Sequence, residues 1–94
     1  MARELVLAQN KPNPFNPSTQ ITWSQPDAGK AEIAIVDAAG RRVRTLVQGA
    51  YPAGVHATLW DGRDDAGRTM AAGVYFYKLD AGGAHLTRKM LLLK

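Results

Sequence analysis

The sequence has 94 residues, no cysteine and a net charge of +4. Its length suits one domain with a modest core and leaves too little chain for a deep, enclosed catalytic site. The lack of cysteine excludes disulfide bonds and thiolate metal sites, while a hydrophobic content of 46% favours a folded chain.

The start of the sequence is interpreted as a linker. No apolar run approaches the roughly 20 residues that cross a bilayer, so we expect no membrane span. Residues 1–7 lack the long hydrophobic region and the cleavage site of a secretory signal peptide. We therefore expect the chain to be part of a longer protein, with residues 1–9 as a linker or leading strand and residues 10–94 as the domain.

Short runs of β-branched and aromatic residues alternate with turn residues along the chain. The one candidate for a helix, after Leu46, runs into Gly49 and Pro52. The sequence therefore predicts an all-β fold, an antiparallel β-sandwich of about seven strands. The expected strands cover residues 20–24, 31–36, 43–47, 55–60, 73–80 and 84–94.

Proline residues stiffen the segment before the first long strand. Pro12, Pro14 and Pro17 fix φ and push the residues before them toward extended geometry. We expect a rigid, ordered lead-in strand, with Phe15 packed as a plug against the sandwich.

A tight turn and a basic patch follow the strand over residues 31–36. Residues 37–40 are predicted to form the turn, in which Gly40 can take a positive φ. Arg41, Arg42 and Arg44 come next, with no interleaved aromatic residues and no nucleic-acid motif. The favoured interpretation is a solvated edge strand whose charge resists sheet-to-sheet pairing, so we expect no nucleic-acid partner.

The polar residues of the middle of the chain lack a catalytic or metal-binding pattern. His56 and His85 have no partner at metal-ligand spacing and no nucleophile motif beside them. The loop over residues 61–67 carries three carboxylates, but Arg63 and Arg68 would compete with a cation. A turn held by bonds from Asp side chains to backbone amides is favoured over a calcium site, and we expect no cofactor.

The strand over residues 73–80 gives the strongest signal in the sequence. Lys78 should face solvent, so Tyr75, Tyr77 and Leu79 should share the opposite face.

The sequence ends in an apolar strand, residues 88–94, with basic residues on both sides. Met90 and Leu92 should lie on one face, and Leu91 and Leu93 on the other. We expect this strand to complete a sheet and to present a free edge that another protein can read. It is also the expected self-contact of a domain that we otherwise expect to be a monomer.

Four segments in chain order carry a family resemblance. They are Asn13-Pro14-Phe15-Asn16-Pro17-Ser18-Thr19-Gln20-Ile21, Ile35-Val36-Asp37-Ala38-Ala39-Gly40-Arg41-Arg42-Val43, Gly73-Val74-Tyr75-Phe76-Tyr77-Lys78-Leu79 and Lys89-Met90-Leu91-Leu92-Leu93-Lys94. Together they resemble the type A C-terminal sorting domain of the type IX, or Por, secretion system. The second segment departs from that family at Val36, where an aromatic residue is common. The sorting-motif residues that the resemblance implies are Asn13, Pro14, Phe15, Asn16, Pro17, Gly40, Arg41, Gly73, Val74, Tyr75, Lys89 and Lys94.

A second resemblance overlaps the first. Residues 60–67, followed by Gly73-Val74-Tyr75, resemble the Ig-like domain of flagellar hook-capping proteins. Both families imply the same immunoglobulin-like antiparallel β-sandwich.

The two resemblances imply different functions, both without catalysis. The sorting family implies a C-terminal sorting and cell-surface attachment module of a larger secreted protein. Such a module passes through the periplasm to the cell surface or the extracellular space, and its partners are an outer-membrane translocon and a sortase-like peptidase. The alternative from the second resemblance is a structural domain of a hook-capping scaffold.

A third alternative is a carbohydrate-binding β-sandwich. It would use Trp23, Trp60 and Tyr51 as a sugar platform, and those rings would have to be exposed and coplanar. Trp60 is instead expected to be buried, because it ends an apolar strand.

Overall fold

The computed structural model describes residues 4–93, and these residues fold into seven strands. Their alternating burial explains why each forms a strand, since every second side chain of a half-buried strand points into the core. The strands are β1 (Val6–Leu7), β2 (Thr19–Gln25), β3 (Gly29–Asp37), β4 (Arg42–Tyr51), β5 (Gly54–Trp60), β6 (Gly73–Ala81) and β7 (Ala84–Leu92).

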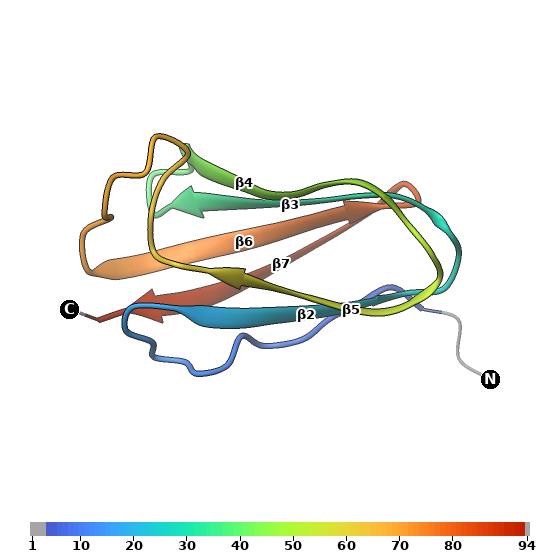
Figure 1. The fold of residues 1–94 in the computed structure, drawn as a ribbon, viewed down its shortest axis with the longest axis horizontal. Coiled ribbons are helices and arrows are strands. Elements are labelled where there is room, and N and C mark those ends of the chain that lie inside the picture. The colour runs from blue at the N-terminus through green and yellow to red at the C-terminus, as the bar shows by residue number, and fades with distance from the viewer. Residues whose placement is uncertain (1–3, 94) are drawn as a thin grey trace.

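The strands pack as two antiparallel sheets, which form two layers (Figure 1). One sheet has three strands in the order β1-β2-β5, and the other has four in the order β4-β3-β6-β7. The predicted immunoglobulin-like sandwich of about seven strands is therefore confirmed. The turn at residues 37–40 is confirmed as well, with Gly40 at a φ of 86°.

The core lies between the sheets and is built from the alternating positions that the sequence indicates. Tyr75, Tyr77 and Leu79 are buried on one face of β6, and Lys78 is exposed on the other. On β7, Met90 is buried and Leu91 is exposed, as expected. The strand faces were thus correctly predicted from the two-residue period.

The core tryptophans rule out the sugar platform. Trp23 and Trp60 are 1% and 0% exposed, and neither ring offers a face to solvent. Their indole N–H groups donate to the Gln25 side-chain oxygen and the Arg63 carbonyl, both at 2.9 Å. Stacking on a sugar requires an exposed ring, so the carbohydrate-binding alternative is wrong for these residues.

The proline-rich segment is an ordered loop, and the prediction of a lead-in strand is wrong. It makes only isolated bridges, one between Lys11 and Gln20 of β2 and one between Phe15 and Leu92 of β7. Proline has no N–H to donate to a ladder, so a segment with three prolines cannot pair continuously. Phe15 itself is 1% exposed, which confirms its expected place in the core.

A tyrosine fixes the start of this loop to the four-stranded sheet. The Tyr77 hydroxyl donates to the Ala8 carbonyl at 2.7 Å and accepts from the Asn10 N–H at 2.8 Å. Burial raises the pKa of Tyr77, and the hydrogen bond from Asn10 and the charge of Arg88 oppose that rise. The N-terminal segment therefore belongs to both layers, because β1 pairs with β2 while the next residues bind β6.

Candidate functional site

The segments that carry the sorting resemblance meet at one end of the sandwich. Gly73, Val74 and Tyr75 begin β6, and they pair with Leu92, Leu91 and Met90 of β7. Tyr75 also pairs with Asp37, the first residue of the turn that contains Gly40 and Arg41. Phe15 bridges to Leu92 from the proline-rich loop. Lys94 lies outside the described residues.

The proline-rich loop covers the outer edge of the terminal strand. The Phe15 N–H donates to the Leu91 carbonyl at 3.0 Å, and the Leu93 N–H donates to the Phe15 carbonyl at 2.8 Å. Asn13 Oδ1 accepts from the Leu91 N–H at 3.1 Å. Further along the strand, the Gln9 side chain donates to the Lys89 carbonyl at 2.8 Å.

These four bonds correct the expectation of a free edge on the terminal strand. A strand edge can template another strand only while its N–H and C=O groups are unpaired. Between Lys89 and Leu93 the outward groups are already bonded to residues 9–15. The side chains of Lys89, Leu91 and Leu93 remain exposed, so a partner could contact side chains there but could not add a strand without displacing the loop.

Two of the motif aromatics belong to the core rather than to a surface. The Phe15 ring lies 5.6 Å from the Trp60 ring, and the Trp60 ring lies 5.3 Å from the Tyr75 ring. The Tyr75 hydroxyl donates to the Ala71 carbonyl at 2.6 Å. Burial raises the pKa of Tyr75, with a smaller contribution from the charge of Asp37. These residues hold the two layers together at this end.

The turn after β3 recurs almost unchanged after β5. Asp37 Oδ1 accepts from the backbone N–H groups of Ala39 and Arg41, and its Oδ2 pairs with Arg41 Nε. Asp64 makes the same three bonds with Ala66 and Arg68. We refer to these two structures, residues 37–41 and 64–68, as the twin turns.

The same physical cause sets the charge state of both turns. The pKa of Asp37 is below its ordinary value of 3.8, chiefly because the Arg41 N–H donates to the carboxylate. The pKa of Asp64 is lowered in the same way by the N–H of Arg68. The twin turns were missed as a repeat, although Asp-x-Ala-Gly-Arg is legible at both places in the sequence.

The acidic loop is tied to β4 by its own carboxylates. Asp61 Oδ1 accepts from Arg44 Nη1 at 2.8 Å, and Asp65 Oδ1 accepts from the Thr45 N–H at 3.2 Å. These bonds, with those of Asp64, confirm that side-chain-to-backbone bonds hold the turn. Across residues 4–93, no group of three or more His, Asp and Glu residues could hold a metal ion.

The histidines and the other arginines have local partners. His56 packs between Trp23 and Tyr51, with ring centroids 5.2 Å away in each case. His85 is exposed and bonds to the Asp80 carboxylate. Arg42 pairs with Glu32 across the β3–β4 ladder at 3.6 Å.

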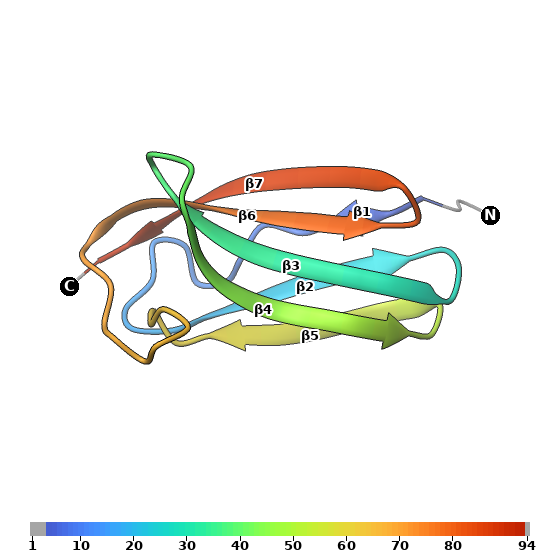
Figure 2. The ribbon, with the colours of Figure 1, turned by 90° about the horizontal axis from the view of Figure 1, so that it is seen from above.

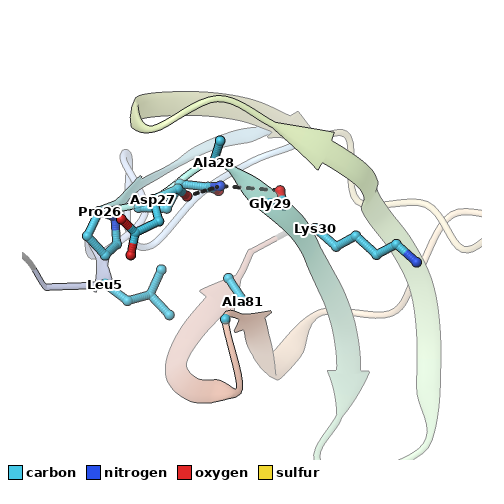
Figure 3. Close-up of a pocket in the computed structure, with 9 residues that line it drawn as sticks. Leu5, Pro26, Asp27, Ala28, Gly29, Lys30 and Ala81 are labelled. Carbon is cyan, nitrogen blue, oxygen red and sulfur yellow. Dashed lines mark hydrogen bonds between the residues drawn. The ribbon is translucent and has the colours of Figure 1, made fainter.

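Two small hollows mark opposite ends of the sandwich. The larger is lined by Leu5, Pro26, Ala28 and Ala81, with Lys30 at its side (Figure 3). Its wall is fixed by Gln25, whose side chain donates to the carbonyls of the turn that follows β2. The smaller lies among the motif residues and is lined by Asn16, Pro17, Asp61, Gly62, Thr69, Met70, Leu92 and Leu93. Both are open, mostly apolar and suited to contact with a side chain.

The chain matches a known family over most of its length. The model of the FlgD Ig-like domain matches residues 10–84. The basal-body rod modification proteins FlgD of Salmonella typhimurium and Salmonella typhi are each 41% identical over 69 residues, which is 71% of this chain. The chain spans only 30% of the length of these curated relatives.

Solved structures share the fold. FlgD from Xanthomonas campestris, described for hook capping, is 31% identical with a TM-score of 0.63, over 93% of this chain and 64% of that one. Latent PorU and the type IX secretion component PorZ, both from Porphyromonas gingivalis, give TM-scores of 0.75 and 0.59. Each is 18% identical to this chain and aligns with 96% of it. The aligned part is only 9% of the PorU chain and 11% of the PorZ chain, so these two structures show the fold alone. No helix within residues 4–93 is long and apolar enough to cross a membrane.

Proposed function

The chain belongs to the FlgD Ig-like domain family, and on that premise we propose that it is a non-catalytic structural domain of a larger protein that works as an extracytoplasmic assembly scaffold of the hook-capping kind. The observation that carries this proposal is the 41% identity to two FlgD proteins over 69 residues. At that identity the matched residues share a fold.

The use of polar groups in the domain supports a scaffold role. Asp37 and Asp64 hold their own turns, and Asn13 holds a strand edge. Among the side chains of residues 4–93, no buried nitrogen or oxygen atom lacks a hydrogen-bond partner. An active site usually leaves polar groups unpaired for a substrate. A domain whose buried polar side-chain atoms are all bonded within its own structure is suited to a structural role.

A domain replacement tests this proposal. The matching segment of Salmonella typhimurium FlgD would be replaced by residues 10–93 of this chain, and motility and hook length would be measured. The control chimera carries an unrelated Ig-like sandwich of similar length. Motility in the first chimera alone supports the proposal. A stable chimera that leaves cells without hooks contradicts it.

The second candidate is the sorting module, and the convergence of its motifs favours it. Asn13, Val74 and Lys89 are exposed motif residues from distant parts of the sequence, and all lie at one end of the sandwich. A translocon in the outer membrane could read that end as one surface. On this proposal the domain is exported through the periplasm, and a sortase-like peptidase acts at the segment before it.

A reporter fusion distinguishes the second candidate from the first. The chain is placed after a signal peptide and a reporter enzyme in a bacterium with a type IX system. Surface reporter activity is expected for the intact chain and a marked loss for Lys89→Ala combined with Lys94→Ala, which should leave the fold intact. Lys11→Ala with Lys30→Ala, at two lysines outside the four motif segments, is the charge-matched control. Periplasmic retention of the intact fusion would contradict the sorting candidate.

A further inference from the structure

Three of the four strands at the sides of the two sheets are protected against pairing. The loop of residues 9–15 covers the last part of β7, from Lys89 onward. The edge of β4 carries Arg42 and Arg44, and Asp65 binds it at Val43 and Thr45. The strand β1 is only two residues long. Charged side chains, a covering loop and a short strand are usual ways in which proteins prevent sheet edges from associating.

The edge of β5 has none of these protections. This strand lies at one side of the molecule, with no strand beyond it in its own sheet (Figure 2). Its seven residues and the seven of neighbouring β2 include no Asp, Glu, Lys, Arg or Pro. A long, uncharged edge without a bulge is the type of edge that templates another strand.

The hydrogen bonds of β2 show which groups of β5 face outward. Thr22 and Gln20 use their backbone carbonyls to bind Ala8 and Lys11, on the side away from β5. In an antiparallel ladder, the residues opposite such positions turn their own N–H and C=O groups away from the shared strand. Thr22 lies opposite Ala57, and Gln20 opposite Leu59. The backbone groups of Ala57 and Leu59 therefore point outward, and those of Val55 follow by alternation.

The same residues also expose apolar side chains. Val55 is 71% exposed and Leu59 is 65% exposed, the two largest values among the exposed large hydrophobic residues of the described chain. The small Ala57 lies between them, also exposed. Opposite them on β2 stand uncharged Ser24, Thr22 and Gln20.

We propose that β5 is a docking edge for β5 of a second copy of this chain, paired antiparallel about a two-fold axis at Ala57. In this register Ala57 faces Ala57 of the second copy, and Val55 faces its Leu59. Each of these positions turns its backbone groups outward, so every pair is a hydrogen-bonded pair. Because the small Ala57 lies at the centre, with the larger Val55 and Leu59 on either side of it, the edge is complementary to itself.

The absence of charge on β5 favours a second copy as the partner, and the small area that two paired strands bury makes the contact weak. An edge without charge fits an uncharged strand, and β5 itself meets that requirement. One pair of strands buries less than the roughly 1,000 Å² of a stable interface, so the pairing is weak when the domain is alone. In a larger assembly, other contacts would raise the effective concentration of the two edges.

Cross-linking tests the register, because the natural chain has no cysteine. Ala57→Cys places one thiol on each copy, directly opposite the other, at about 5.5 Å between Cα atoms. Leu59→Cys is the matched control, since its two thiols would lie four residues apart, about 13 Å along the strands. A short bis-maleimide, to which each thiol adds, should link Ala57→Cys at least about tenfold faster than Leu59→Cys. Equal rates would overturn the proposed register.

Sedimentation of the chain over a range of concentrations tests the edge itself. Ala57→Lys places like charges opposite each other and should weaken self-association at least about tenfold. Gln20→Lys adds the same charge to the same sheet face, on the central strand, and should have little effect. Circular dichroism verifies that both variants fold. A monomer at all concentrations, or equal weakening by both variants, would overturn the proposal, and so would pairing only with strands from other proteins.

Discussion

Asn13 and Leu91 are 78 residues apart in the sequence, and the side-chain oxygen of one accepts the backbone N–H of the other at 3.1 Å. This bond joins the first and last segments that resemble sorting motifs. With the two backbone bonds of Phe15, it closes the edge of the terminal strand. Residues that resemble a recognition signal therefore also complete the fold, and variants at these positions must be checked for stability before a loss of recognition is inferred.

The Asn13 side chain should contribute measurably to stability. Asn13→Ala removes the acceptor for the Leu91 N–H, and we expect a loss of about 0.5–1 kcal/mol in the free energy of unfolding, because the bond is exposed. Urea denaturation measures it. Asn16→Ala, an exposed change in the same loop, is the control and should change stability by less than about 0.5 kcal/mol. Equal effects would show that the bond to Leu91 is unimportant.

The Tyr77 hydroxyl should contribute more, because it is buried and has two partners. Tyr77→Phe leaves the Ala8 carbonyl and the Asn10 N–H without their partner, and we expect a loss of about 1–3 kcal/mol. Thermal and urea unfolding measure it. Tyr51→Phe removes a hydroxyl from a half-buried ring and is the matched control, with a smaller expected loss. A loss below that of the control would contradict the role assigned to Tyr77.

Gly62 should tolerate no side chain. Its φ is +76°, and a Cβ would lie 2.9 Å from the Pro17 carbonyl oxygen. Gly62→Ala therefore combines backbone strain with a clash, with an expected loss of about 2–4 kcal/mol. Gly67→Ala at a φ of +84° meets no atom within 4 Å, so strain alone should cost about 1–2 kcal/mol. Equal losses would mean that the loop moves away from Gly62 without cost.

The twin turns should make the domain sensitive to acid. The folded-state pKa values of Asp37 and Asp64 lie below the ordinary value of 3.8. A carboxylate with a depressed pKa stabilises the fold above its unfolded pKa, and this stability is lost as the pH falls through the folded pKa. Asp37→Asn combined with Asp64→Asn should therefore flatten the fall in Tm between about pH 5 and pH 2. An equal slope in the natural and the doubly substituted protein would contradict this account.

Local patterns in the sequence predicted much of the fold, because they follow from backbone geometry. The two-residue period placed Tyr75, Tyr77 and Leu79 in the core. Gly40 marked a turn because it takes a positive φ without strain. These signals involve only neighbouring residues, so they can be recognised in a single sequence.

Long-range contacts could not be predicted in the same way. The bond from Asn13 to Leu91 leaves no periodic trace, and three prolines resembled an extended strand although their segment is a loop. The free edge was expected on the terminal strand, because an apolar strand has the same sequence pattern whether its edge is open or covered by a loop. The open edge of β5 became visible only when the partners of β2 were known.

The central structural claim is that residues 9–15 close the edge of β7, while β5 keeps the open edge. Amide hydrogen exchange, followed residue by residue by NMR in dilute solution and again at about 1 mM, tests it most directly. We predict that the N–H groups of Leu91 and Leu93 are protected at both concentrations. The Ala57 N–H should exchange at least about tenfold faster than they do in dilute solution, and should slow at the higher concentration. Fast exchange at Leu91 and Leu93, or a protected Ala57 in dilute solution, would contradict the account.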